Sequence, residues 1–170
     1  MNAEYNTHDI ENFLEISKEI EAKPENKSLQ KLLSVKDKID IFKDIDEFEL
    51  KALVYHVEFK KIPIKKHIIQ ENEASKNIYF ILKGECHVYK GSRHIGTLSE
   101  GDTFGEIGVI FNLKRSANVI AASNDVVVLK FCIDQENLDF NAKALAILYK
   151  NLAASINDKL QELNIAYIKK

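Results

Sequence analysis

The sequence has no tryptophan, one methionine, two prolines and only six glycines in 170 residues. Glycine is therefore at about half of its usual share of roughly 7%. Collagen-like and low-complexity chains are rich in glycine or proline, so this composition excludes both classes. The two cysteines, Cys86 and Cys132, are too few for a disulfide framework and too far apart in sequence for a metal-binding or redox motif.

A large excess of one charge and long apolar runs are also missing. The 24 basic and 26 acidic residues give a net charge of −2, whereas a nucleic-acid-binding domain is usually strongly basic. No apolar run approaches the roughly 18 residues that a membrane span needs. Residues 1–6 have neither the basic region nor the apolar core of a signal peptide. The sequence therefore predicts a cytoplasmic protein with reduced thiols and without a membrane or direct nucleic-acid partner.

Residues 1–56 have the pattern of N-terminal helices. Apolar residues recur at helical spacing between residues 10 and 20, and a second apolar set follows Ser28. A third helix is indicated after Asp46, because Glu49 stands at the spacing of a capping box ahead of an apolar run. We expect these helices to pack on a core formed mainly by the next segment.

Residues 57–135 have the pattern of an antiparallel β-roll. Runs rich in β-branched and aromatic residues alternate with turn clusters about every 8–12 residues, as in a sandwich or barrel. The predicted strands are His67–Gln70, Ile78–Leu82, Cys86–Lys90, His94–Leu98, Ala117–Ala122 and Val126–Cys132. The last of them is almost continuously apolar, which is typical of a strand buried on both faces.

All six glycines lie between residues 84 and 108. Glycine adopts positive φ angles without steric cost, so we expect tight backbone bends to be concentrated there. Gly84, Gly91, Gly96 and Gly101 are predicted at or near turns of the roll. Gly105 and Gly108 fall in the motif at residues 101–122.

Residues 136–170 are predicted to form one long C-terminal helix. An apolar stripe begins at Leu145 and continues to Leu163 at a mean spacing of about 3.6 residues, which fits a straight helix better than a supercoiled one. Such a helix can pack on its own β-roll or pair with a second copy of the chain, and the pattern allows both. The whole chain is thus predicted to be a single domain of the α+β class, mainly β.

Residues 101–122 carry the pattern that indicates chemistry. A glycine turn leads through Phe104-Gly105-Glu106 into a short apolar helix, and Arg115 opens the next strand. The start of a helix offers free N–H groups to an anion, and Gly105 lets a ligand approach the backbone closely. Arg115 has a planar charged fork suited to phosphate oxygens, and an ionised Glu106 accepts hydrogen bonds from hydroxyls such as those of a ribose. These residues suit a nucleotide, although a surface ion pair of Glu106 with Arg115 is the alternative explanation.

The ordered combination of motifs resembles the cyclic-nucleotide-binding domain family, which includes the bacterial catabolite activator protein and the regulatory subunits of cAMP-dependent kinase. The phosphate-binding cassette of that family runs Phe-Gly-Glu-(Leu/Ile)-(Ala/Gly)-Leu and then, after a short loop, Arg-(Ser/Thr/Ala)-Ala-x-Val. This sequence has Phe104-Gly105-Glu106-Ile107-Gly108-Val109 and Arg115-Ser116-Ala117-Asn118-Val119. The resemblance covers about residues 39–165, including the strand pair at 78–89 and the turn at 98–104.

The resemblance implies a role for each matching residue of the cassette. Glu106 would bind the ribose 2′-hydroxyl and Arg115 would neutralise the cyclic phosphate. The cradle would be completed by the Ser116 hydroxyl and by backbone groups of Gly105, Glu106, Ile107 and Ala117. Lys114 and Asn118 depart from the usual proline and threonine or serine, but neither departure removes a ligand-binding side chain.

In the family, the C-terminal helix covers the base of the nucleotide. The possible lid residues here are Asn157, Lys159 and Gln161, none of which is the threonine or serine that the bacterial activator would place there. The resemblance therefore implies a cyclic nucleotide as the ligand and no further cofactor. It favours cAMP over cGMP because Arg-Ser-Ala is similar to the version in the bacterial activator.

The resulting hypothesis is a stand-alone, non-catalytic sensor without an effector domain, which signals through its C-terminal helix to an unknown protein effector. The first alternative is a degenerate fold that serves as a protein-interaction or homodimerisation module without a nucleotide. The second is another phosphorylated ligand in the same pocket. The five histidines have no metal-binding spacing and Ser116 has no histidine near it in sequence, so neither a metal site nor an enzyme is predicted.

Overall fold

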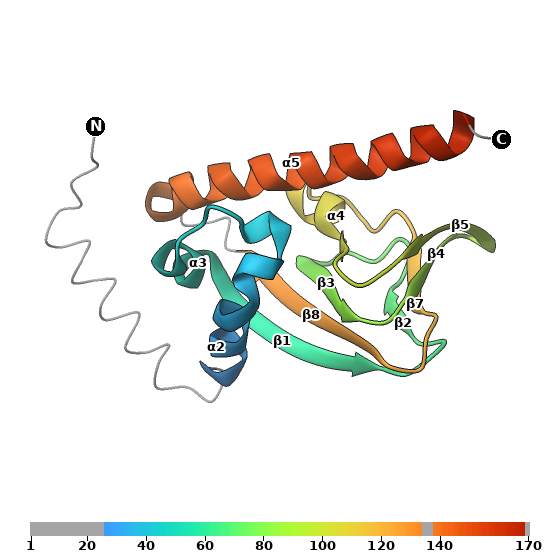
Figure 1. Ribbon diagram of the computed structural model, residues 1–170, viewed down its shortest axis with the longest axis horizontal. Coiled ribbons are helices and arrows are strands. Elements are labelled where there is room, and N and C mark those ends of the chain that lie inside the picture. Colours follow the sequence, from blue (N-terminus) through green and yellow to red (C-terminus); the bar gives the residue numbers. More distant parts are fainter. Residues whose placement is uncertain (1–25, 134–137, 169–170) are drawn as a thin grey trace, which may run out of the picture.

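The computed structural model describes residues 26–133 and 138–168. N-terminal helices are followed by a β-roll and then by one long helix that crosses the molecule (Figure 1). This is the predicted α+β architecture. The helix expected between residues 10 and 20 lies outside the described residues.

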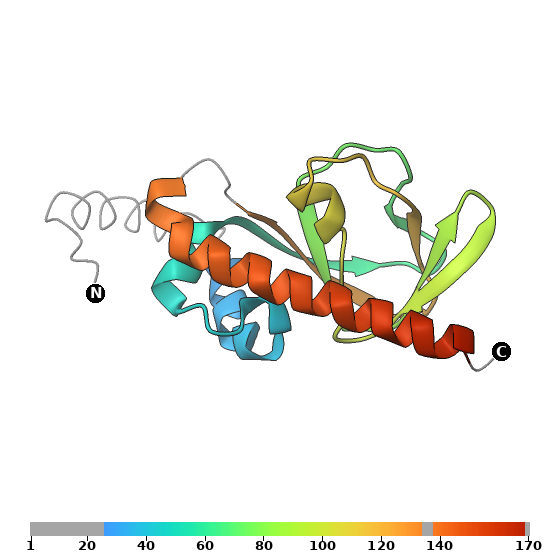
Figure 2. The ribbon, with the colours of Figure 1, turned by 90° about the horizontal axis from the view of Figure 1, so that it is seen from above.

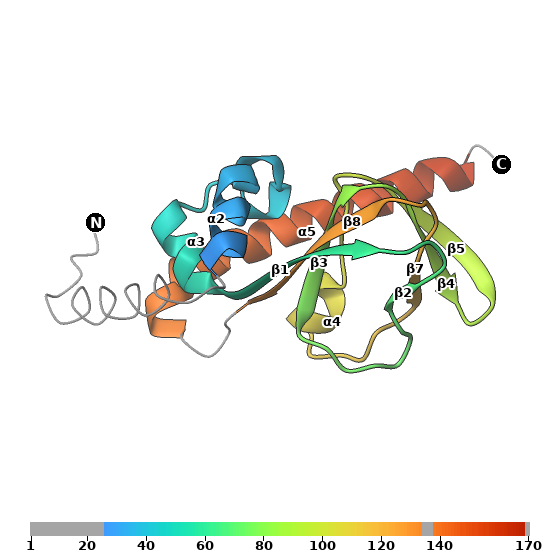
Figure 3. The same cartoon turned by 90° about the horizontal axis from the view of Figure 1, so that it is seen from below.

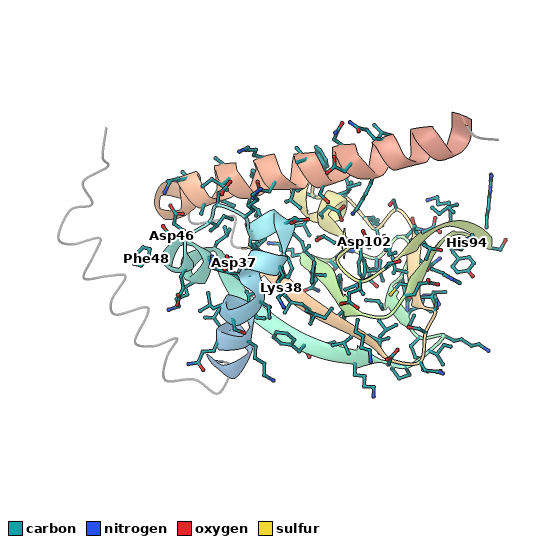
Figure 4. All side chains as sticks on the ribbon, viewed as in Figure 1. Asp37, Lys38, Asp46, Phe48, His94 and Asp102 are labelled. Atoms are coloured by element: carbon teal, nitrogen blue, oxygen red, sulfur yellow. The ribbon has the colours of Figure 1, made fainter. Side chains whose placement is uncertain are left out.

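The N-terminal helical part leads directly into the first strand. Its elements are α2 (Asn26–Val35), the 3-10 turns η1 (Lys36–Lys38) and η2 (Asp40–Phe42), and α3 (Glu47–Leu53). The predicted capping box is present at α3, where the Asp46 carboxylate accepts a hydrogen bond from Glu49 N at 2.7 Å and the Glu49 carboxylate accepts one from Asp46 N at 3.4 Å. Figure 4 shows Asp46 beside α3, below the N-terminal end of the long helix.

The β-roll consists of two four-stranded antiparallel sheets, which are seen from below in Figure 3. The first sheet orders β1 (Val54–Ile62), β8 (Val126–Ile133), β3 (Asn77–Lys83) and β6 (Thr103–Phe104). The second orders β2 (His67–Ile69), β7 (Asn118–Ala121), β4 (Cys86–Lys90) and β5 (Arg93–Leu98). All six predicted strands are present, and their ends differ from the prediction by at most one residue.

Three details of the roll differ from the sequence pattern. Strand β1 begins at Val54 rather than at residue 57, because the apolar run of α3 passes into the strand without a glycine or proline between them. Strand β6 is only two residues long and forms by pairing with Tyr79 and Phe80, so it has no alternating pattern of its own. Gly96 lies inside β5 and not at a turn.

Strand β8 connects the two apolar cores. Leu129 and Phe131 face the larger core under the helices, where the Phe131 ring lies 5.1 Å from that of Phe42. Val126 and Val128 face the smaller core inside the roll. The prediction of a strand buried on both faces is therefore confirmed, and both free cysteines, Cys86 and Cys132, are buried.

The long helix α5 (Leu138–Ile168) has 31 residues and extends about 46 Å at 1.5 Å per residue. Figure 2 shows it passing first over the N-terminal helices and then along the roll. The described part of the chain contains no helix that is both long and apolar enough to cross a membrane.

The two halves of α5 are held differently. In the first half, the buried residues are Ala144, Leu145, Leu148 and Leu152. Asn151 adds hydrogen bonds from Nδ2 to the carbonyls of Ile41 at 3.2 Å and Lys43 at 2.7 Å. Leu160, further along the predicted apolar stripe, is 55% exposed. The first half therefore packs on the helices of its own chain, whereas pairing of the second half with another copy stays a prediction.

Candidate functional site

Gly105 starts the short helix α4 (Glu106–Ile110) from a left-handed backbone conformation with φ of 84°. A Cβ atom built at this position would lie 2.9 Å from Nη1 of Arg115 and 3.1 Å from Cδ1 of Ile69. Both the backbone angle and the lack of space therefore require glycine. The helix that follows packs against β3 and is seen below α5 in Figure 1.

Arg115 is folded against the backbone on either side of this glycine. Its side chain donates from Nη1 to the Gly105 carbonyl at 2.5 Å and from Nη2 to the Asn77 carbonyl at 2.6 Å. The residue is only 3% exposed. Its Nε atom is buried and has no hydrogen-bond partner among the described residues. The guanidinium thus connects the cassette to β3, and three of its five N–H groups, including that of Nε, take no part in these two hydrogen bonds.

The position of Arg115 in the folded protein disfavours the charged form of its guanidinium. Burial lowers the pKa of its guanidinium from the ordinary value, while Tyr79, Glu73 and Glu106 act in the opposite direction. Within the described residues, Arg115 forms no ion pair with a carboxylate. A buried cation without an anionic partner is costly, so an anion that reached this position would be strongly favoured.

Glu106, the first residue of α4, is 5% exposed and is paired with a residue of α5. Its Oε1 lies 3.0 Å from Nζ of Lys159. The same ammonium donates a hydrogen bond to the carbonyl of Thr103. Of the three possible lid residues, Lys159 therefore contacts the cassette, whereas Asn157 and Gln161 are exposed on α5.

The remaining predicted site residues lie along the same segment. Ile107 is 44% exposed on α4, Ser116 is exposed and Ala117 is partly buried. The Ser116 carbonyl accepts a hydrogen bond from Nζ of Lys90 at 2.7 Å, which fixes the backbone next to Arg115. The structure thus brings the arginine, the glycine and the glutamate together, and their roles toward a ligand stay predictions.

Several residues that shape the site are not indicated by the sequence pattern. Asn77 and Thr103 contribute through their carbonyl oxygens, which every residue type has. Glu73 also acts through its carbonyl, which accepts from the backbone N of Arg115 at 2.9 Å. The turn that carries Glu73 includes Asn72 with φ of 67°, the left-handed angle that asparagine tolerates.

The fold and the buried arginine beside a short helix define a β-roll domain with a site suited to a small anion. Residues 59–138 match the family model of the cyclic nucleotide-binding domain. Residues 59–138 therefore belong to the cyclic nucleotide-binding domain family, as the sequence resemblance predicts. Among the described residues, no group of three or more histidine, cysteine, aspartate or glutamate side chains is arranged to hold a metal ion.

Among known proteins, this chain is similar to parts of both cGMP-dependent and cAMP-dependent kinases. The cGMP-dependent protein kinase 2 of Mus musculus is 25% identical over 131 residues, which are 76% of this chain and 17% of the kinase. The chain spans less than a fifth of the length of this kinase and of two other curated relatives that it matches.

Solved structures confirm the fold. The regulatory domain of Toxoplasma gondii PKA with cAMP has a TM-score of 0.58 at 19% identity, covering 76% of this chain and 51% of that one. The regulatory subunit of a cAMP-independent protein kinase A from Trypanosoma cruzi, bound to guanosine, has a TM-score of 0.55 at 12% identity, covering 65% of this chain and 40% of that one.

Proposed function

We propose that this chain is a non-catalytic regulatory module that binds a cyclic nucleotide in the cassette at residues 101–122, with cAMP preferred over cGMP. The observation that carries the proposal is Arg115. Its guanidinium is buried, keeps an unpartnered Nε and lies against Gly105 at the start of α4. A cyclic phosphate carries one negative charge and acceptor oxygens, so it supplies both the charge and the acceptor that this arginine lacks.

The other cassette residues would each bind a different part of the ligand. The N–H groups at the start of α4 are donors at the positive end of a helix, and the Ser116 hydroxyl is a further donor, so both suit the phosphate oxygens. The Glu106 carboxylate is an acceptor, which suits the ribose hydroxyl. Gly105 leaves the room that a side chain would take from the ligand or from Arg115.

The output of the module would be a change in the position of α5. The helix already contacts the cassette through Lys159, and Asn157 and Gln161 lie on the same helical segment as candidate contacts to the base. A ligand shifts such an equilibrium only as far as its affinities for the two helix positions differ. A protein effector that recognises one position of α5 would then report the ligand.

The preference for cAMP is supported by the similarity of Arg115-Ser116-Ala117 to the cassette of the bacterial activator. The similarity to a cGMP-dependent kinase makes cGMP the necessary comparison. Calorimetric titration of the full chain with each nucleotide tests the proposal. Absence of heat and of any thermal shift with either nucleotide at millimolar concentration would refute it.

The chain offers a matched control for Arg115, because its only other arginine, Arg93, is exposed on β5. Loss of two charge-assisted hydrogen bonds at roughly 1.5–3 kcal/mol each predicts that Arg115→Ala weakens binding about 10²- to 10⁴-fold. Arg93→Ala is expected to bind like the original protein. Circular dichroism would establish that both variants are folded, and retained affinity in folded Arg115→Ala would contradict the site assignment.

A second candidate function is a protein-interaction or dimerisation module without a nucleotide. It is favoured by large apolar side chains exposed near the cassette and on α5, namely Phe111 at 63%, Leu113 at 56% and Leu160 at 55%. Analytical ultracentrifugation of the protein and of a Leu160→Glu variant separates the two candidates. Nucleotide-independent dimers that the substitution disrupts would support this second function.

A further inference from the structure

The contact between Lys159 and Glu106 lies in the part of the site that the proposed function assigns to the ribose. Glu106 is 5% exposed, and its Oε1 is 3.0 Å from the Lys159 ammonium. An ammonium and a ribose hydroxyl are both donors that this carboxylate can accept, and a ribose that bonds to Oε1 has to displace the lysine. The two partners are 53 residues apart in sequence, so only the packing of α5 brings them together.

Two further features make this contact strong. The ammonium also donates to the Thr103 carbonyl, so two of its three protons are bound by the cassette. The Lys159 side chain is 30% exposed and that of Glu106 only 6%, so water screens the pair less than it screens a surface ion pair. A ligand that takes the carboxylate oxygen therefore has to break a well-formed interaction.

Few apolar side chains of α5 are buried between residues 153 and 161. Among the α5 residues whose side chains the structure describes, the last buried apolar one is Leu152, and Leu160 is 55% exposed. Hydrogen bonds from Asn151 to the carbonyls of Ile41 and Lys43 anchor the helix before this point. Movement of residues 153–161 would therefore break the polar contacts of Lys159 and expose little buried apolar surface of these residues.

We propose that Lys159 is an internal competitor of the nucleotide, which occupies Glu106 and holds the second half of α5 on the cassette until the ribose displaces it. The proposal rests on the proposed function for the identity of the competing ligand. It adds a residue that sets the affinity of the site and couples occupancy to the position of α5. A contact that occupies Glu106 in about nine molecules of ten lowers the apparent affinity about tenfold.

The test replaces Lys159 by methionine, which keeps most of the side-chain length and removes the charge. Titration of the full chain with cAMP and cGMP is expected to show about tenfold tighter binding for Lys159→Met. The control is Lys150→Met, an exposed lysine on the same helix, which should leave the affinity unchanged. Unchanged or weaker binding by Lys159→Met would overturn the proposal, because it would make the lysine neutral or a ligand contact.

A second measurement needs no nucleotide and separates the two proposals. Melting temperatures of Lys159→Met, Glu106→Gln and the double variant form a double-mutant cycle. The internal pair predicts that the shifts are not additive, since the second substitution removes a contact that the first has already broken. Additive shifts would refute the contact, whatever the nucleotide does. Non-additive shifts without any nucleotide binding would refute the proposed function and leave the pair intact.

Discussion

Replacement of Gly105 by alanine perturbs the site at its most crowded backbone position. The new Cβ would lie 2.9 Å from Nη1 of Arg115, 3.1 Å from Cδ1 of Ile69 and 3.3 Å from the Asn77 carbonyl. An arginine end group can often move aside, but this one is 3% exposed and bonded to two carbonyls. The substitution must therefore displace the group that we expect to bind the phosphate.

The expected loss of stability of Gly105→Ala has two parts. A non-glycine residue in the left-handed region costs about 1–2 kcal/mol, and overpacking of a buried site adds roughly 1–3 kcal/mol. The less flexible unfolded chain offsets about 0.4–1 kcal/mol of this. We therefore expect the free energy of unfolding to fall by about 2–4 kcal/mol, together with a large loss of nucleotide affinity.

Gly91 provides the matched control. Its φ of 57° is also left-handed, but no atom lies within 4 Å of the Cβ position. Gly91→Ala should therefore cost only the backbone part, about 0.5–1 kcal/mol after the same offset. Urea denaturation of both variants gives the two free energies by linear extrapolation. Equal losses in the two variants would show that the contacts of Gly105 with Arg115 and Ile69 do not constrain the cassette.

Two further predictions concern the scaffold. Burial raises the pKa of the Cys86 thiol from 9.0 to about 11, so the thiolate is disfavoured in the folded state. The free energy of unfolding therefore falls as pH rises from about 9 to 11. At 1.36 kcal/mol per pH unit, the loss is roughly 2–3 kcal/mol. Urea denaturation at pH 8 and 11 should show a larger decline for the original protein than for Cys86→Ala, and equal declines would contradict the assignment. Asp46→Ala removes the cap of α3 and should cost about 1 kcal/mol by the same assay, whereas the exposed Asp37→Ala should change the stability by less than about 0.5 kcal/mol. A cost no greater than that of Asp37→Ala would show that the capping box does not stabilise the fold.

The parts of the fold that the sequence predicts well are those with local causes. Turn clusters delimit strands β2, β3, β4, β5, β7 and β8, and the capping box marks the start of α3. Strand β1 is missed because the apolar run of α3 passes into it without a glycine or proline, and β6 is missed because two residues are too few to show a strand pattern. Val54 pairs with Ile133, and Thr103 pairs with Phe80.

The candidate site likewise contains residues that the sequence indicates and residues that it does not. Gly105, Glu106 and Arg115 stand out in the sequence because their side chains, or the lack of one, suit an anion and a hydroxyl. The carbonyls of Asn77 and Thr103 give no such signal, since a backbone oxygen is common to all residues. The roles of Ile107, Ser116 and Ala117 toward a ligand remain predictions.

By itself, the sequence determined most helices and six of the eight strands in the described part of the chain, where the backbone must bend, and which residue types meet in the cassette. Each of these follows from preferences of neighbouring residues, which act along the chain. Only the tertiary structure decided that Arg115 turns onto the carbonyls of Gly105 and Asn77, and that Lys159 reaches Glu106. Those contacts depend on the packing of α5 and β3 against the cassette, because burial strengthens a polar contact only where tertiary packing excludes water from it.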